Sequence, residues 1–191
     1  MYKIRGFYDL IGLKAVNLNF IFLNWLYNLT NFIMPKDHLY STTVTWTGNK
    51  GSGTMDYRSY DRDYVISVKG KADISGSSDS AFLGDKSKYN PEDLLLASVS
   101  SCHMLWYLHL CSKNEIVVID YKDEAVGTME ESADGSGRFK EVTLHPLVLI
   151  ADKAHYELAA SLHHEANKMC FIANSLNFPV KHEPVCKAEN G

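Results

Sequence analysis

The sequence predicts an α+β domain, and three observations support this prediction. Segments with alternating or β-branched apolar residues, which are typical of strands, occur in two groups. Each group is followed by one long apolar segment of helical length. The resulting order of strands, helix, strands and helix favours α+β over a regular βαβ alternation. A chain of 191 residues is long enough for one such domain, or for a domain with an appendage.

The composition is that of an ordinary globular protein, with 46% hydrophobic and 22% charged residues. The formal net charge of −4 provides no general basic field, so we expect neither nucleic acid nor a membrane as a partner. Four cysteines are too few for a disulfide scaffold, and no two of them form a CxxC pair. We therefore expect no metal and no other cofactor.

Residues 1–33 differ from the rest of the chain because they are rich in Phe, Leu, Ile, Trp and Tyr. A membrane span needs about 20 predominantly apolar residues, and Lys14 and five asparagines interrupt this segment. Lys3 and Arg5 could begin a secretory signal, but no small-residue cleavage site follows. We interpret residues 1–33 as an N-terminal extension outside the fold and residues 34–191 as the domain.

The first group of strands is predicted between residues 40 and 72. Residues 40–47 alternate between larger side chains and Ser or Thr, and a turn cluster follows at 48–53. Residues 54–60 and 64–68 are predicted as two further strands of an antiparallel meander. The polar, Gly- and Ser-rich residues 75–90 are predicted as a long loop, and such loops are often functional.

A long helix is predicted to begin after Asn90. Asn90 suits the N-cap, Pro91 suits the first helical position, and Glu92 and Asp93 suit the positive end of the helix dipole. The following residues, 94–111, are apolar on almost every face. This pattern predicts a central helix that is buried on all sides, by a sheet or by a second subunit.

The second half repeats the order of strands and helix. Strands are predicted at residues 116–121, 124–130, 138–142 and 144–150. A second long helix is predicted at residues 154–176, and residues 179–184 are predicted to end the fold.

Two cysteines lie in the predicted helices. Cys102 is in the middle of the central helix, and Cys170 is in the second helix. A free cysteine often acts only as a small buried hydrophobe, and this interpretation stays open for Cys111 and Cys186. Cys111 follows Cys102 by nine residues, which places it on the opposite helix face, so these two cannot pair.

Residues 90–103, NPEDLLLASVSSCH, and residues 169–180, MCFIANSLNFPV, together resemble the OsmC/Ohr family of thiol peroxidases. The family pattern is an Asn-Pro-Glu helix start, a peroxidatic cysteine ten residues after that glutamate, and a second cysteine in a later helix. Glu92 and Cys102 are ten residues apart, and Cys170 follows 68 residues later. The resemblance implies antiparallel sheets wrapped around two long central helices in an intertwined homodimer.

The resemblance also implies a reaction. The Cys102 thiolate would attack an organic hydroperoxide and become a sulfenic acid, which Cys170 would convert to a disulfide. A dithiol reductant, of the lipoyl type in this family, would restore both thiols. The alternative is an OsmC-fold protein that binds a small molecule or senses redox state without fast turnover. Cycling thiols suit a reducing cytoplasm, so we expect a cytoplasmic protein.

A thiolate at Cys102 needs a nearby positive charge, because apolar surroundings disfavour the charged form. In the family, an arginine held by the glutamate supplies this charge. Arg62 is the first candidate and Arg58 the second, and strand alternation does not separate them. Ten helical residues rise about 15 Å, so Glu92 cannot approach Cys102 on one straight helix. Either the helix breaks, or Glu92 comes from the second subunit of a two-fold dimer.

His103 is a departure from the familiar family pattern. A histidine beside a reactive cysteine could tune it or bind a metal, but His103 and Cys102 point about 100° apart on a helix. His163 and His164 on the second helix could approach and complete a mixed Cys/His site. Without a fixed ligand spacing, this remains a secondary hypothesis beside the metal-free one.

Overall fold

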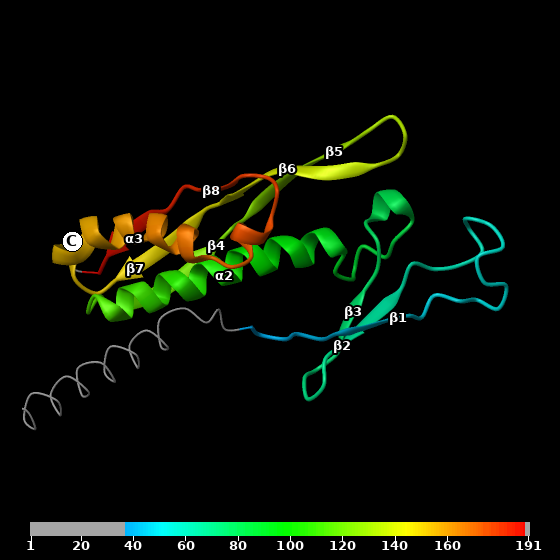
Figure 1. Cartoon of the computed structure of the whole chain (residues 1–191), viewed down its shortest axis with the longest axis horizontal. Coiled ribbons are helices and arrows are strands. Elements are labelled where there is room, and N and C mark those ends of the chain that lie inside the picture. Colours follow the sequence, from blue (N-terminus) through cyan, green and yellow to red (C-terminus); the bar gives the residue numbers. More distant parts are fainter. Residues whose placement is uncertain (1–36, 190–191) are drawn as a thin grey trace, which may run out of the picture. The chain divides into compact units, whose positions relative to one another are not determined.

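The computed structural model describes residues 37–189, which form an α+β fold (Figure 1). Within this range, residues from Thr42 onwards form one compact unit. The predicted extension, residues 1–33, lies outside the described residues, so its separation from the domain stays a prediction.

The N-terminal strands form an antiparallel sheet in the order β1 (Thr43–Trp46), β2 (Tyr64–Ser67) and β3 (Ile74–Gly76). The predicted meander is therefore present, but the predicted strand at residues 54–60 is wrong. Side chains there hold the backbone in turns. The Asn49 carboxamide accepts hydrogen bonds from the backbone N–H groups of residues 51 and 53, and Asp56 accepts one from residue 58.

The predicted start of the central helix α2 (Pro91–Lys113) is confirmed. The Asn90 side chain accepts a hydrogen bond from the Asp93 backbone N–H at 2.7 Å. The Asp93 carboxylate accepts one from the Asn90 N–H at 3.2 Å. This reciprocal capping box satisfies two backbone donors that the helix itself leaves free.

Asn90→Ala is expected to lower the free energy of unfolding by about 1 kcal/mol, because it removes this cap. Chemical denaturation followed by circular dichroism measures the change. Asn177→Ala is a suitable control, since Asn177 is exposed and forms no side-chain hydrogen bond with the described residues. An equal loss in both variants would contradict the capping role.

The C-terminal half contains two mixed sheets. Their strands are β4 (Val118–Asp123), β5 (Val126–Glu131), β6 (Gly137–Leu144), β7 (Pro146–Ile150), β8 (Val180–His182) and β9 (Val185–Ala188). The strand orders are β4-β7-β9 and β5-β6-β8. The pairs β4–β7 and β5–β6 are antiparallel, whereas β9 pairs in parallel with β7 and β8 in parallel with β6. The predicted antiparallel pairing is thus confirmed for these two pairs, whereas the parallel pairs were not expected, and residues 179–184 do not end the fold. The strands β8 and β9, with three and four residues, were not predicted because they are too short to show an alternation of apolar and polar residues.

The second helix, α3 (Tyr156–Met169), is shorter than predicted. Cys170 has an extended backbone and forms the C-cap, and a 3₁₀ turn, η3 (Ala173–Ser175), follows. The Asn174 side chain donates a hydrogen bond to the Lys168 carbonyl at 2.8 Å, which satisfies one of the last helical acceptors. Cys170 therefore lies at the end of α3, not inside it.

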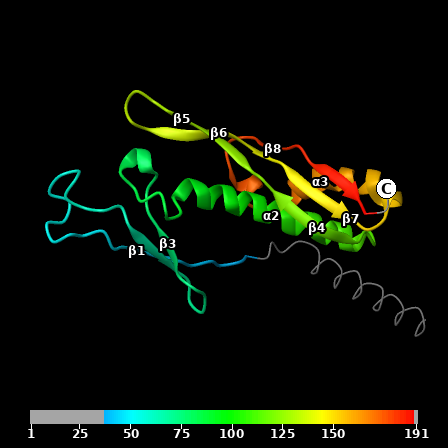
Figure 2. The same ribbon diagram turned by 180° about the vertical axis from the view of Figure 1, so that it is seen from behind.

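Helix α2 lies along α3 and β4 in both views (Figures 1 and 2). It buries a single stripe of residues spaced four apart, namely Val99, His103, Tyr107 and Cys111. The prediction of burial on every side is not met within the described chain. By length and composition alone, α2 could cross a membrane, a test that the core helix of a soluble protein also passes.

Candidate functional site

The packing of α2 against α3 brings Cys102 and Cys170 together, although they are 68 residues apart. Cys102 is half-buried on α2, and Cys170 is completely buried at the C-cap of α3. Burial, with the neighbouring Cys102 thiol as the second cause, raises the pKa of Cys170 to about 11. The Ala173 backbone N–H donates to the Cys170 sulfur at 3.4 Å.

This arrangement gives the two thiols different properties. Cys102 is partly exposed to a reactant, whereas Cys170 is completely buried and, with its raised pKa, protonated at neutral pH. All four cysteines are free thiols. The geometry suits a pair in which Cys102 reacts first and Cys170 attacks the product.

Apolar side chains form a ledge beside the thiols, consisting of Leu105, Trp106 and Phe171. Trp106 follows Cys102 by one helical turn, and Phe171 follows Cys170 directly. The Trp106 and Phe171 rings meet edge to face, with centroids 5.5 Å apart. Phe171 is 66% exposed and Leu105 is 62% exposed, so the ledge is open to an apolar ligand.

Arg62 and Glu92 are not brought to Cys102 within the described chain. The Arg62 guanidinium lies between the rings of Tyr57 and Tyr60, at 4.2 and 4.3 Å from their centroids. It donates hydrogen bonds to the backbone carbonyls of these two tyrosines. In residues 37–189 it forms no ion pair with Glu92, which lies half-buried in the first turn of α2. Both predicted roles therefore stay predictions.

A pair of buried histidines lies in the same contact between α2 and α3. The His103 Nε2 and His163 Nδ1 atoms are 3.1 Å apart and share a hydrogen bond, and both side chains are completely buried. The Tyr107 ring stacks on His163 at 3.9 Å, and the His182 ring of β8 is 5.7 Å from His103. His164, the other histidine predicted to approach, is exposed and does not join this pair.

The histidine pair has no clear sequence signal beyond the position of His103 beside Cys102. The two residues are 60 positions apart, and only the packing of the helices joins them. Within residues 37–189, no group of three or more His, Cys, Asp or Glu side chains is arranged to hold a metal ion.

Because of the histidine pair, we expect the free energy of unfolding to fall in acid. Burial lowers the pKa of His103 to about 4, and that of His163 to about 3, from the ordinary value of 6.5. The unfolded chain therefore binds more protons below pH 6.5, and stability present above that pH is lost as pH falls towards 4. Each imidazole contributes a slope of up to about 1.4 kcal/mol per pH unit.

Urea unfolding at a series of pH values measures this slope. The variant His163→Phe keeps the stack on Tyr107 and removes one titrating group, so its slope below pH 6.5 is expected to be shallower. Identical slopes in the variant and the unaltered protein would refute the assignment.

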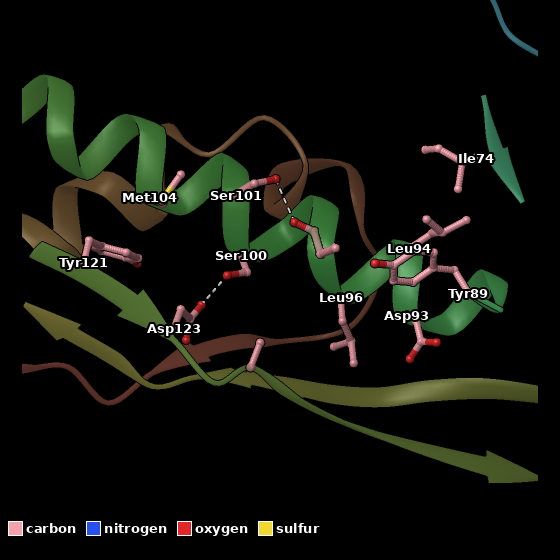
Figure 3. Close-up of a pocket in the computed structure, with 12 residues that line it drawn as sticks. Ile74, Tyr89, Asp93, Leu94, Leu96, Ser100, Ser101, Met104, Tyr121 and Asp123 are labelled. Atoms are coloured by element: carbon pink, nitrogen blue, oxygen red, sulfur yellow. Dashed lines mark hydrogen bonds between the residues drawn. The ribbon is translucent and has the colours of Figure 1, made fainter. Parts of the chain in front are cut away.

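An open groove of about 930 Å³ runs along α2 on a different face (Figure 3). Its floor includes Leu94, Ala97, Ser101 and Met104, and Tyr121 lies at one side. The Ser100 hydroxyl points towards Asp123 and donates a hydrogen bond to its carboxylate. The lining is mainly apolar and contains neither thiol.

The family assignment follows from residues 84–184, which match the model of the family described as OsmC-like protein. The chain belongs to the OsmC-like family. This span includes the start of α2, both thiols and both buried histidines. The predicted membership is therefore confirmed.

Solved structures of OsmC-like proteins support the same fold. An OsmC-like protein of unknown function from Vibrio cholerae is 29% identical, with a TM-score of 0.71, over 78% of this chain and all of that chain. An organic hydroperoxide resistance protein from Elizabethkingia anophelis is 18% identical, with a TM-score of 0.57, over 81% of this chain and all of that one. A Legionella pneumophila protein, also described as an organic hydroperoxide resistance protein, is 16% identical, with a TM-score of 0.56, over 79% of this chain and 99% of that one. No curated protein sequence matches this chain.

Proposed function

We propose that this OsmC-like protein is a thiol peroxidase that reduces organic hydroperoxides through Cys102 and Cys170. The contact between the half-accessible Cys102 and the buried Cys170 carries this proposal. The names of the Elizabethkingia and Legionella proteins add support for this substrate class.

The proposed cycle has three steps. The Cys102 thiolate attacks the terminal peroxide oxygen, so that an S–O bond forms, the O–O bond breaks, and the alkoxide takes up a proton and leaves as an alcohol. The Cys170 sulfur then attacks the Cys102 sulfenic acid, which forms the disulfide and releases water. A dithiol reductant, of the lipoyl type in our proposal, supplies two electrons and two protons by exchange.

The ledge beside the thiols supports a preference for apolar substrates over hydrogen peroxide. Phe171 exposes apolar surface beside the thiols, and the Trp106 ring packs against it. Burying an apolar substituent against such surface is favourable by about 25 cal/mol per Å². Hydrogen peroxide has no such substituent to bury.

A homodimer is the proposed assembly, with Arg62 and Glu92 acting across the interface. Three features support it: the exposed α2 stripe of Ala97, Ser101 and Leu105, the apolar groove beside it, and strands β1–β3 with few buried residues. A second copy of α2 would cover the stripe and the groove. Cytoplasmic location, where reductants keep thiols cycling, is part of the same proposal.

Leu105→Glu is expected to convert this dimer to a monomer, because it places a charge in the apolar interface. Light scattering on the full chain should give twice the chain mass of 21.5 kDa for the unaltered protein and one chain mass for the variant. Leu158→Glu on α3 is the control, as Leu158 is 42% exposed and lies outside the stripe. A monomeric unaltered protein would exclude the proposed dimer.

Titration of the reduced protein with cumene hydroperoxide, in the presence of excess dihydrolipoate, tests the function. The peroxidase proposal predicts consumption of many equivalents per chain. The alternative, an OsmC-fold binding or redox-sensing protein without fast turnover, is favoured by the apolar groove along α2. It predicts consumption of one equivalent per chain or none, and either result would replace the enzyme proposal.

A further inference from the structure

The two buried histidines and the two thiols occupy the same contact between α2 and α3. His103 directly follows Cys102 on α2. His163 lies on α3, and Cys170 is the C-cap residue of the same helix, seven residues later. The His103–His163 hydrogen bond therefore joins the two helices next to the point where the thiols meet.

Stability alone does not explain this histidine pair. The His103 Nδ1 and His163 Nε2 atoms are buried and have no hydrogen-bond partner among the described residues. Whichever tautomer is present, one ring leaves an N–H group unsatisfied and the other leaves a lone pair. Each such group costs about 1–3 kcal/mol, which two packed apolar side chains would avoid.

We propose that the His103–His163 hydrogen bond is a positioning contact, which holds Cys102 against Cys170 for disulfide formation and releases them when acid protonates the pair. This inference rests on the proposed function, because it assigns a device to its second step. The two histidines touch neither substrate nor reductant and act only through the helices that carry the thiols.

No carboxylate shifts the pKa of either histidine, so a positive charge on the pair would be unbalanced. His182 from β8 faces His103, and the Tyr107 ring stacks on His163. Further out, Tyr121 packs on Tyr107, and the exposed His164 faces His182. Other imidazoles, not carboxylates, are the charged groups that shift the pKa values of His103 and His163. A first proton therefore places an uncompensated charge in the core. A second removes the last ring acceptor, and the hydrogen bond is lost.

Oxidation by diamide tests this inference without any hydroperoxide, so a failed peroxidase proposal does not affect the result. The rate of Cys102–Cys170 disulfide formation is followed by alkylation and mass spectrometry from neutral pH to about pH 3, a range that includes the pKa values of both histidines. Circular dichroism confirms folding at each pH. The alkylation rate of Cys102 corrects for the loss of thiolate with falling pH.

Two variants separate positioning from simple packing. His103→Gln with His163→Asn places neutral amide groups near the positions of the bonded ring nitrogens, so it keeps a hydrogen bond that cannot titrate. At neutral pH, we expect this double variant to form the disulfide at the same rate as the unaltered protein. In acid, we expect its rate to fall only as much as the loss of Cys102 thiolate requires. His103→Leu removes the bond and should slow disulfide formation about fivefold to tenfold at neutral pH. His164→Leu, on the exposed face of α3, is the control.

An unchanged rate in His103→Leu at neutral pH would overturn the inference. So would a double variant that loses rate in acid as steeply as the unaltered protein. If His103→Leu does not fold, the rate of disulfide formation in the double variant as a function of pH decides alone. A pair with a purely structural role would give the double variant and the unaltered protein the same loss of rate in acid.

Discussion

Cys102→Ser is expected to abolish hydroperoxide consumption, with a loss of at least about a thousandfold in rate. A serine hydroxyl is a far weaker nucleophile than a thiolate, and the other three cysteines are buried, whereas Cys102 is partly exposed. Cys170→Ser is expected to behave differently. It should consume one equivalent of hydroperoxide per chain and stop at a sulfenic acid that dimedone can trap. Consumption of cumene hydroperoxide measures both variants.

Cys111→Ser and Cys186→Ser are the matched controls. Both sulfurs are in the core beside Tyr107, on the buried side of α2, and neither has a role in the proposed cycle. The rates of these two variants should remain within about twofold of the unaltered rate, provided that they fold. Rapid consumption by Cys102→Ser would show that another group reacts with the hydroperoxide and would remove Cys102 from the proposal.

Arg62→Ala is expected to lower the reactivity of Cys102 at neutral pH by about tenfold or more. A positive charge within about 4–6 Å favours a thiolate, and its removal returns the thiol to the protonated form. The rate of Cys102 alkylation by iodoacetamide measures the thiolate directly and requires no peroxidase activity. Arg58→Ala is the control, since Arg58 is exposed and is the second candidate for the same role.

The proposed dimer allows a more specific form of this prediction. If Arg62 acts from the second subunit, Arg62→Ala should have no further effect in the monomeric Leu105→Glu background, whereas it should have its full effect in the dimer. Unchanged alkylation in Arg62→Ala, together with slower alkylation in Arg58→Ala, would transfer the role to Arg58. No effect in either variant would eliminate an arginine from these two positions.

The features predicted well from the sequence are those that local chemistry decides. The capping box of Asn90 and Asp93 involves residues three apart, so the start of α2 could be read directly. Strands β4 to β7 contain enough alternating or β-branched residues to be found. In contrast, β8 and β9 depend on parallel pairing with β6 and β7, from which they are separated by α3. Such pairing leaves no trace in three or four residues.

The candidate site was also predictable only in part. The spacing of Glu92, Cys102 and Cys170 carried the family resemblance, and the structure places the two cysteines in contact. The end of α3 was missed because a side chain, Asn174, replaces the helical partner of the Lys168 carbonyl. The histidine pair was not predicted as a hydrogen-bonded unit, because helix packing alone brings residues 60 positions apart to 3.1 Å.

Mass spectrometry of the reduced protein after one equivalent of cumene hydroperoxide tests the central claim most directly. The proposal predicts one equivalent of alcohol, the loss of two thiols, and a single cross-linked peptide pair that joins Cys102 to Cys170. A disulfide that involves Cys111 or Cys186, or a reacted protein in which Cys170 remains a free thiol, would contradict it.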